Sequence, residues 1–151
     1  MLAFGQPILI GGDLGPHIRL RNFDAPEQDF AWSTGRWCEV EFDLDLGRGG
    51  GRGRGGHAAP VTFLVDLDAF RCPPVFTGQN VLTYLNGSRV HSAFVSGRRM
   101  LSFAPRGDVL VPGANLLTFD VPDAIRPLEF GLEDNRMLGV QVFSIAIEPV
   151  G

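Results

Sequence analysis

One stretch of this sequence alternates apolar and acidic residues so regularly that it constrains the fold more than any other feature. In CEVEFDLDL, from Cys38 to Leu46, every even-numbered residue is apolar and every odd-numbered residue is acidic. Successive side chains of a β-strand point to opposite faces of a sheet. The pattern therefore predicts a half-buried strand with one wet face.

Similar period-two patterns recur along the chain, separated by turn residues. Asn86-Gly87 divides one of them and is the strongest short signal of a β-hairpin. About eight short strands without helical periodicity predict an all-β protein, an antiparallel β-sandwich of jelly-roll type. PLEFGLEDNRM is expected to add one helical turn. The other expected strands lie in PILIGG, HIRLRNF, VTFLVDLDAF, NVLTYL, SRVHSAFV, RRMLSFAP, NLLTFDVPD and LGVQVFSIAIEP.

The length and composition fit one folded domain. The 151 residues, 44% of them apolar, are enough for a single core, so we expect one domain over residues 1–151. The Gly/Arg-rich segment 47–60 lies between two strands that we expect to pair, and we interpret it as a flexible loop. An RNA-binding role is disfavoured because the segment has no aromatic residue and the net charge is -4. We therefore expect no nucleic-acid partner.

Compartment and redox state are less constrained. No apolar run reaches the roughly 20 residues of a membrane helix, so we expect no direct membrane insertion. The N-terminus carries no signal-peptide pattern. A location at the cell surface, outside the cell or in a particle is nevertheless favoured. Cys38 and Cys72 match no metal spacing and are expected to be inert core thiols, with a disulfide left open.

No motif for catalysis is present. The sequence contains no phosphate loop, dinucleotide fingerprint, zinc signature or nucleophile elbow. The acidic residues of the alternating strand resemble a solvated sheet face rather than a glycosidase pair. We therefore predict that the protein is not an enzyme and needs no cofactor. A structural calcium ion stays open, with oxygen ligands from Asp13, the segment 24–29, Asp120 and Asp123.

Three stretches together resemble a known kind of domain. They are LRNFDAPEQDFAWSTGRWCEVEFDLDL, YLNGSRVHSAFV and LLTFDVPDAIRPLEFGLEDNRMLGVQVFSIAI, and the resemblance covers residues 4–148. The combination resembles an uncharacterised bacterial β-sandwich domain that accompanies glycosyltransferases and polysaccharide-assembly proteins. The resemblance implies a jelly roll like that of carbohydrate-binding modules and galactose-binding domains. It carries over no catalytic residues.

The same residues also suggest a clasp between the two ends of the domain. Arg36 is expected to donate a forked pair of hydrogen bonds to Glu27 or Asp134. Asp134 and Arg136, in a tight turn, would hold the first loop against the last. Gly139 would allow a close backbone approach or a bulge at the start of the last strand. A ligand site made from the same groups remains the alternative.

The two tryptophans receive different predictions. Trp32 precedes the alternating strand and is expected to plug one end of the core. Trp37 has the parity of Glu39 and Glu41, so it is expected on the wet face, where its ring would stack on a sugar. Loop packing and a protein interface are the alternatives for Trp37. The candidate ligand-binding residues are Arg36, Trp37, Glu39, Glu41 and Tyr84.

These patterns favour a non-catalytic accessory module that binds a bacterial surface or exported polysaccharide. The alternative is a structural or assembly module that docks to other protein subunits in a cell-surface or phage-like particle, such as a spike, capsid or tail.

Overall fold

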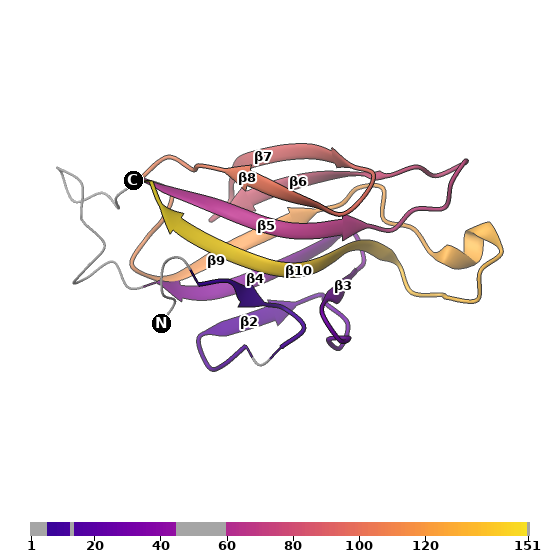
Figure 1. Cartoon of the computed structure of the whole chain (residues 1–151), viewed down its shortest axis with the longest axis horizontal. Helices are drawn as coiled ribbons and strands as arrows, with labels where there is room; N and C mark the ends of the chain where they lie inside the picture. Colours follow the sequence, from indigo (N-terminus) through magenta and orange to yellow (C-terminus); the bar gives the residue numbers. More distant parts are fainter. Residues whose placement is uncertain (1–5, 13, 45–59, 151) are drawn as a thin grey trace.

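A computed structural model of the protein describes residues 6–12, 14–44 and 60–150. Within these ranges the chain forms ten strands and one 3-10 turn (Figure 1). The strands are β1 (Ile8–Leu9), β2 (Ile18–Arg21), β3 (Ala31–Thr34), β4 (Trp37–Leu44), β5 (Val61–Ala69), β6 (Gln79–Leu85), β7 (Ser88–Val95), β8 (Arg99–Phe103), β9 (Gly113–Asp120) and β10 (Leu138–Pro149). The 3-10 turn is η1 (Pro127–Phe130).

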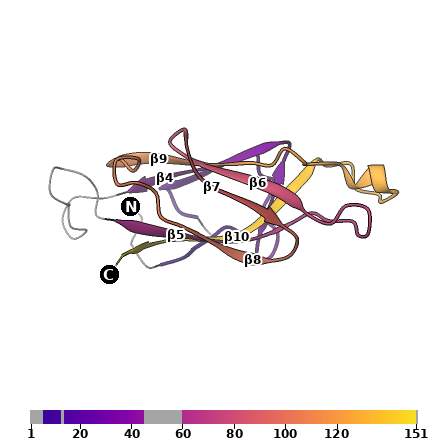
Figure 2. The same ribbon diagram turned by 90° about the horizontal axis from the view of Figure 1, so that it is seen from above.

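The strands form two antiparallel sheets that pack face to face. Sheet 1 has the order β2-β4-β9-β6-β7, and sheet 2 has the order β1-β10-β5-β8, with β3 also paired to β10. Figure 2 shows β4 and β9 in one layer and β5 and β10 in the other. From β4 to β10 the chain crosses repeatedly between the layers, as in a jelly roll. The predicted all-β sandwich is therefore confirmed.

The core lies between the inner faces of the two sheets and follows the predicted alternation. In β4 the even-numbered residues from Cys38 to Leu44 are buried, and in β5 the odd-numbered residues from Val61 to Ala69 are buried. Phe42 of sheet 1 meets Phe63 of sheet 2 edge to face at 6.2 Å between ring centroids. Phe63 also stacks on Phe103 at 5.4 Å. Aromatic contacts thus join the layers across the middle of the core.

One buried polar side chain also connects the two sheets. Gln79 begins β6 in sheet 1, and its Nε2 donates to the carbonyl oxygens of Phe70 and Gly139, both at 3.0 Å. Phe70 follows β5 and Gly139 lies in β10, so both acceptors belong to the sheet 2 layer. A buried amide donor must find acceptors, which fixes the register of the two layers at this end.

Two expectations about strand pairing are wrong. The strands on either side of segment 47–60, β4 and β5, do not pair, because they lie in different sheets and take β9 and β10 as partners. Trp32 was expected in a loop or first turn leading into the alternating strand. It lies instead in a separate strand, β3. Gly35, at φ 80°, turns the chain between β3 and β4 and sends them into different sheets. The flexible loop predicted at 47–60 falls outside the described residues except for Pro60.

Two other local predictions, a turn and a helical segment, are confirmed. Asn86 and Gly87 form the turn between β6 and β7 with φ of 49° and 84°, which these two residue types tolerate. One helical turn, η1, lies in the segment where it was expected. No helix in the described ranges is long and apolar enough to cross a membrane.

The cysteines match their prediction only in part. Cys38 is fully buried, and burial raises the pKa of its thiol. Cys72 is only half-buried, because it lies in the loop between β5 and β6 and not in the core. Both thiols are free.

Truncating the central ring tests this core. Phe63→Ala removes a fully buried ring that contacts both layers, and we expect the free energy of unfolding to fall by about 3–5 kcal/mol. Phe94→Ala is the control, because Phe94 is 51% exposed, and it should change stability by about 0.5 kcal/mol or less. Urea unfolding monitored by circular dichroism measures both. Equal losses would contradict the assignment of the core.

Candidate functional site

The outer face of sheet 1 carries a groove that crosses three neighbouring strands. Its volume is about 360 Å³. The walls come from β4, from β6 and from the turn after it, and the floor comes from β9. The lining residues are Arg36, Trp37, Glu39, Tyr84, Gly87, Thr118 and Asp120.

Strand register explains why these side chains converge. Trp37 pairs with Asp120, and Glu39 pairs with Thr118. On the other side of β9, Thr118 pairs with Tyr84. Because β9 lies between β4 and β6, these two outer strands are roughly 10 Å apart at the usual strand spacing. Trp37 lies diagonally from Tyr84, since Glu39 occupies the row of Thr118 and Tyr84. Two aromatic side chains thus flank a polar floor.

Trp37 is the most exposed aromatic part of the groove. It is 45% exposed, although it sits in a regular strand of a well-packed sandwich. If a described loop packed over Trp37, as one alternative expected, the indole ring would be covered. The ring is instead open to solvent. Its place on the wet face follows from the parity of β4, whose buried residues start at Cys38.

The partner of Arg36 differs from the expected one. Its Nε donates to Oδ1 of Asp120 at 2.9 Å, and its Nη2 donates to Oδ2 at 3.4 Å. Glu27 and Asp134 are therefore not its partners. The Asp120 carboxylate, through these hydrogen bonds and its charge, raises the pKa of Arg36. The fork fixes a guanidinium beside Trp37 at one end of the groove.

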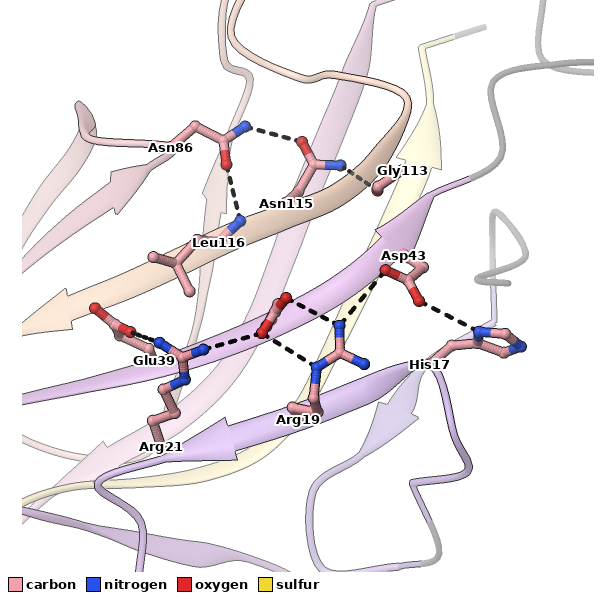
Figure 3. Close-up of polar contacts among 10 residues, drawn as sticks. His17, Arg19, Arg21, Glu39, Asp43, Asn86, Gly113, Asn115 and Leu116 are labelled. Atoms are coloured by element: carbon pink, nitrogen blue, oxygen red, sulfur yellow. Dashed lines mark hydrogen bonds and ion pairs between the residues drawn. The ribbon is translucent and has the colours of Figure 1, made fainter.

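A pair of asparagines fixes the opposite wall (Figure 3). Asn86 Nδ2 donates to Oδ1 of Asn115 at 2.8 Å, and the Leu116 backbone N–H donates to Oδ1 of Asn86 at 2.8 Å. Asn115 is almost fully buried, and its Nδ2 donates in turn to the carbonyl of Gly113 at 3.0 Å. These bonds attach the β6–β7 turn to the start of β9, which holds Gly87 at the rim of the groove.

Beside the groove, β2 and β4 are joined by a ladder of charged side chains. Arg19 donates a fork to Glu41 at 2.9 and 3.1 Å, and Arg21 contacts both Glu41 and Glu39. At the far end His17 Nδ1 lies 3.3 Å from Asp43 (Figure 3). Arg19, through its hydrogen bonds, lowers the pKa of Glu41. Glu41 therefore belongs to this ladder and does not line the groove. Glu39 belongs to the ladder and also lines the groove.

The residues proposed as a clasp meet only in part. Arg136 donates from Nη1 to Asp24 at 2.7 Å and from Nη2 to Asp134 at 2.7 Å, so it joins the loop after β2 to the loop before β10. Glu27 is exposed and takes no part in this contact. Its backbone N–H closes a turn with the carbonyl of Phe30 at 2.8 Å.

Trp32 and Gly139 lie near each other in sheet 2. Trp32 is half-buried and makes edge contacts with Phe30 at 6.1 Å and Phe70 at 6.5 Å. A Cβ at Gly139 would lie 2.7 Å from the Oγ of Ser33, so no side chain fits there without movement. The β3–β10 register also shifts between Leu138 and Gln141, next to this glycine. Both residues are structural in these contacts and lie away from the groove.

Three of the carboxylates considered for calcium have other partners. Asp24 binds Arg136, Asp120 binds Arg36, and Asp123 accepts from the backbone and side-chain N–H groups of Asn80, both at 2.9 Å. In the part of the chain that the structure describes, no three His, Cys, Asp or Glu side chains gather closely enough to hold a metal ion. Asp13 lies outside the described residues.

Three groove residues were not identified as ligand contacts from the sequence. Asp120 was considered only as a calcium ligand, and Thr118 and Gly87 were not considered. The parity of NLLTFD places Thr118 and Asp120 on the wet face, which is a usable signal. Their alignment with Trp37 depends on the pairing of β4 with β9, which sequence alone does not give.

Comparison with known proteins identifies the fold but not a family. No protein-family model matches the sequence, and no curated protein matches it. Among solved structures, an acetyl xylan esterase (Est2A) from the rumen bacterium Butyrivibrio proteoclasticus is similar over 99% of this chain and 34% of that chain, at 10% identity and a TM-score of 0.53. The carbohydrate-binding module CBM36 in complex with calcium and xylotriose is similar over 95% of this chain and 99% of that chain, at 10% identity and a TM-score of 0.49. A family two carbohydrate esterase from Clostridium thermocellum in complex with cellohexaose is similar over 89% of this chain and 33% of that chain, at 11% identity and a TM-score of 0.46.

The chain thus spans about a third of the length of each esterase. At these identities the likeness to Est2A shows a shared β-sandwich fold and nothing about the ligand.

The Arg136 contact makes acid stability testable. Hydrogen bonds from Arg136 hold the pKa of Asp134 below its ordinary value of 3.8. A carboxyl group whose pKa is lower in the folded state contributes stability above its unfolded pKa and loses it as the pH falls through the folded pKa. Arg136→Met should therefore lower the unfolding temperature at neutral pH, and its effect should shrink as the pH falls from about 4, the unfolded pKa of Asp, through the lower folded pKa of Asp134.

Thermal unfolding between neutral pH and about pH 2 measures this effect. The matched control is Arg106→Met, because the Arg106–Asp108 pair is largely exposed and should contribute little at any pH. An Arg136→Met effect that is constant with pH would contradict the role of the ion pair.

Proposed function

We propose that this protein is a non-catalytic glycan-binding module and that the groove on sheet 1 binds an uncharged segment of polysaccharide. The observation that carries the proposal is the exposed Trp37, which lies diagonally across a polar floor from Tyr84. An aromatic ring covers the apolar face of a pyranose, and neighbouring polar groups hydrogen-bond its hydroxyls.

The shape of the groove suits a chain rather than a small enclosed ligand. It runs over the outer surface of three strands, and its volume of about 360 Å³ lies at the low end of the range of ligand sites. Hydrogen bonds position its walls, because Arg36 donates to Asp120 and Asn86 of the β6–β7 turn donates to Asn115. A preorganised surface reduces the entropy that binding must overcome.

The charges in the groove are already paired. Arg36 neutralises Asp120, and Arg21 lies 3.8 Å from Glu39. An anionic sugar would meet two carboxylates, and its negative charge would have to displace one of them from its arginine. The groove therefore suits hydroxyl groups, which both donate and accept hydrogen bonds.

The groove favours glycan binding over glycan hydrolysis. Glycoside hydrolysis requires two carboxyl groups that flank the scissile bond, one of them in a desolvated position. Asp120 and Glu39 both lie on an open surface and both contact arginine. We propose a polysaccharide on the bacterial surface or exported from the cell as the natural ligand. This choice follows the resemblance of the sequence to a β-sandwich domain that accompanies polysaccharide-assembly proteins.

Tyrosine and tryptophan variants test the groove with xylotriose, cellohexaose and a purified bacterial exopolysaccharide as probes. Tyr84→Ala should weaken binding about tenfold, or about 1.4 kcal/mol, and the fluorescence of Trp37 reports it. Trp37→Ala should abolish binding measured by calorimetry, with little change in unfolding temperature because its ring is exposed. Glu41→Gln is the control, since Glu41 lies outside the groove. Unchanged affinity in Trp37→Ala would overturn the proposal.

An assembly module is the second candidate, and one observation favours it. Val75, Leu128 and Leu132 are 81%, 53% and 46% exposed in two loops at the same end of the sandwich (Figure 1). Phe76 and Phe130 stack at 5.6 Å and join these loops. Apolar side chains gathered in this way are typical of protein contacts.

Sedimentation velocity separates the two candidates. The glycan-binding proposal expects a monomer at micromolar concentration. An oligomer that Leu128→Asp dissociates, together with no response to any glycan, would support the assembly module instead. Ser102→Asp serves as the control, because Ser102 is exposed on β8, away from these loops.

A further inference from the structure

The last strand carries a bulge on the outer face of sheet 2, the face opposite to the groove. β10 pairs with β5 in antiparallel register, but Val142 and Ser144 face the consecutive residues Leu67 and Asp66, so Phe143 is an additional residue. A bulge re-aims side chains. Phe143 and Ser144 consequently both line a second cavity, of about 270 Å³.

An arginine is fixed over the bulged aromatic ring. The guanidinium carbon of Arg98 lies 3.7 Å from the centroid of Phe143. Arg98 Nε and Nη2 donate to the two oxygens of Asp66 at 3.1 and 2.9 Å. The cation–π contact and the fork hold one orientation of the guanidinium plane. Nη1 of Arg98 has no hydrogen-bond partner among the described residues, so its N–H groups remain available to a ligand.

Two loops approach each other closely to form the opposite wall. A Cβ at Gly11 would lie 2.6 Å from the carbonyl carbon of Asp29 and 2.6 Å from the backbone nitrogen of Phe30. Only glycine allows this approach without displacing the backbone. Phe30 also packs on Phe143 at 5.3 Å between centroids, which attaches the wall to the bulge.

The lining offers both donors and acceptors around an apolar surface. Gln28 and Ser144 can each donate and accept, Arg98 donates, and Asp29 accepts. Leu9, 61% exposed, lies at the rim. Two carboxylates, Asp29 and Asp66, face one guanidinium, so the field of the cavity disfavours an anion.

From this geometry we propose that the cavity formed by Arg98, Phe143 and the Gly11–Gly12 segment binds a neutral polyol of monosaccharide size, the end residue of an uncharged glycan. Each sugar hydroxyl is both donor and acceptor and suits the mixed lining. The volume is below the range of about 300–1,000 Å³ typical of drug-sized ligands and therefore suits one ring. The site does not depend on the groove, because the two lie on opposite outer faces of the sandwich.

Titration of the ¹⁵N-labelled full chain with glucose, galactose and xylose, each in turn, tests the proposal by amide chemical shifts. We expect saturable shifts at Gly11, Gly12 and Ser144 with at least one of these sugars, and about tenfold weaker shifts or none with glucuronate, which carries a charge. Arg98→Met keeps an apolar stem over Phe143 but loses the donors, so it should weaken binding about tenfold. Ser144→Ala gives an independent, smaller loss should Arg98→Met disturb the fold.

Trp37→Ala is the matched control and should leave these shifts unchanged. No shift at Gly11, Gly12 and Ser144 with any of the three sugars would overturn the proposal, as would equal affinity in Arg98→Met and the parent chain, or equal binding of glucuronate. Shifts at the Trp37 indole without shifts at Gly11 would reject this cavity alone. Shifts at Gly11, together with the same affinity for the oligosaccharide probes in Trp37→Ala and the parent chain, would reject the proposed function alone.

Discussion

Contact between the inner faces of the two sheets is the constraint on which the rest of the structure depends. The buried side chains of β4 and β5 meet at Phe42 and Phe63, and the alternation that buries them sends their neighbours outward. Trp37 and Asp66 therefore lie on the outer faces for the same reason that Cys38 and Val65 are buried. Each outer face presents polar side chains in fixed rows because the core fixes the parity of every strand. Both candidate sites are built from such rows.

Much of the fold and part of the groove could be predicted from the sequence, since both follow from local patterns. The alternation in 38–46 gave the wet face on which Trp37 and Glu39 lie, and Asn86-Gly87 marked its turn. Strand β3 was missed because its four residues, AWST, show no apolar contrast of their own. The partner of Arg36 was missed because Asp120 is 84 positions away and meets it only through the β4–β9 pairing.

The second cavity was beyond sequence reasoning for a different reason. The segment VQVFSIAI is apolar at most positions, so no period in it shows that Phe143 is an additional residue of a bulge. Arg98 likewise looks like one of two adjacent surface arginines until the register of β8 against β5 places it beside Asp66. Bulges and long-range register are properties of the paired sheet and not of a single strand.

The order of the strands also has a consequence for how the chain folds. Of the eight pairings between described strands, only β6–β7 joins strands that are adjacent in the sequence. Every other pairing must close a longer loop before its contacts form, and proteins dominated by such contacts fold slowly, on the order of milliseconds to seconds. The β6–β7 hairpin is thus the one pairing between described strands that needs only a short turn, and the asparagine pair that fixes the groove wall is also what attaches this hairpin to β9.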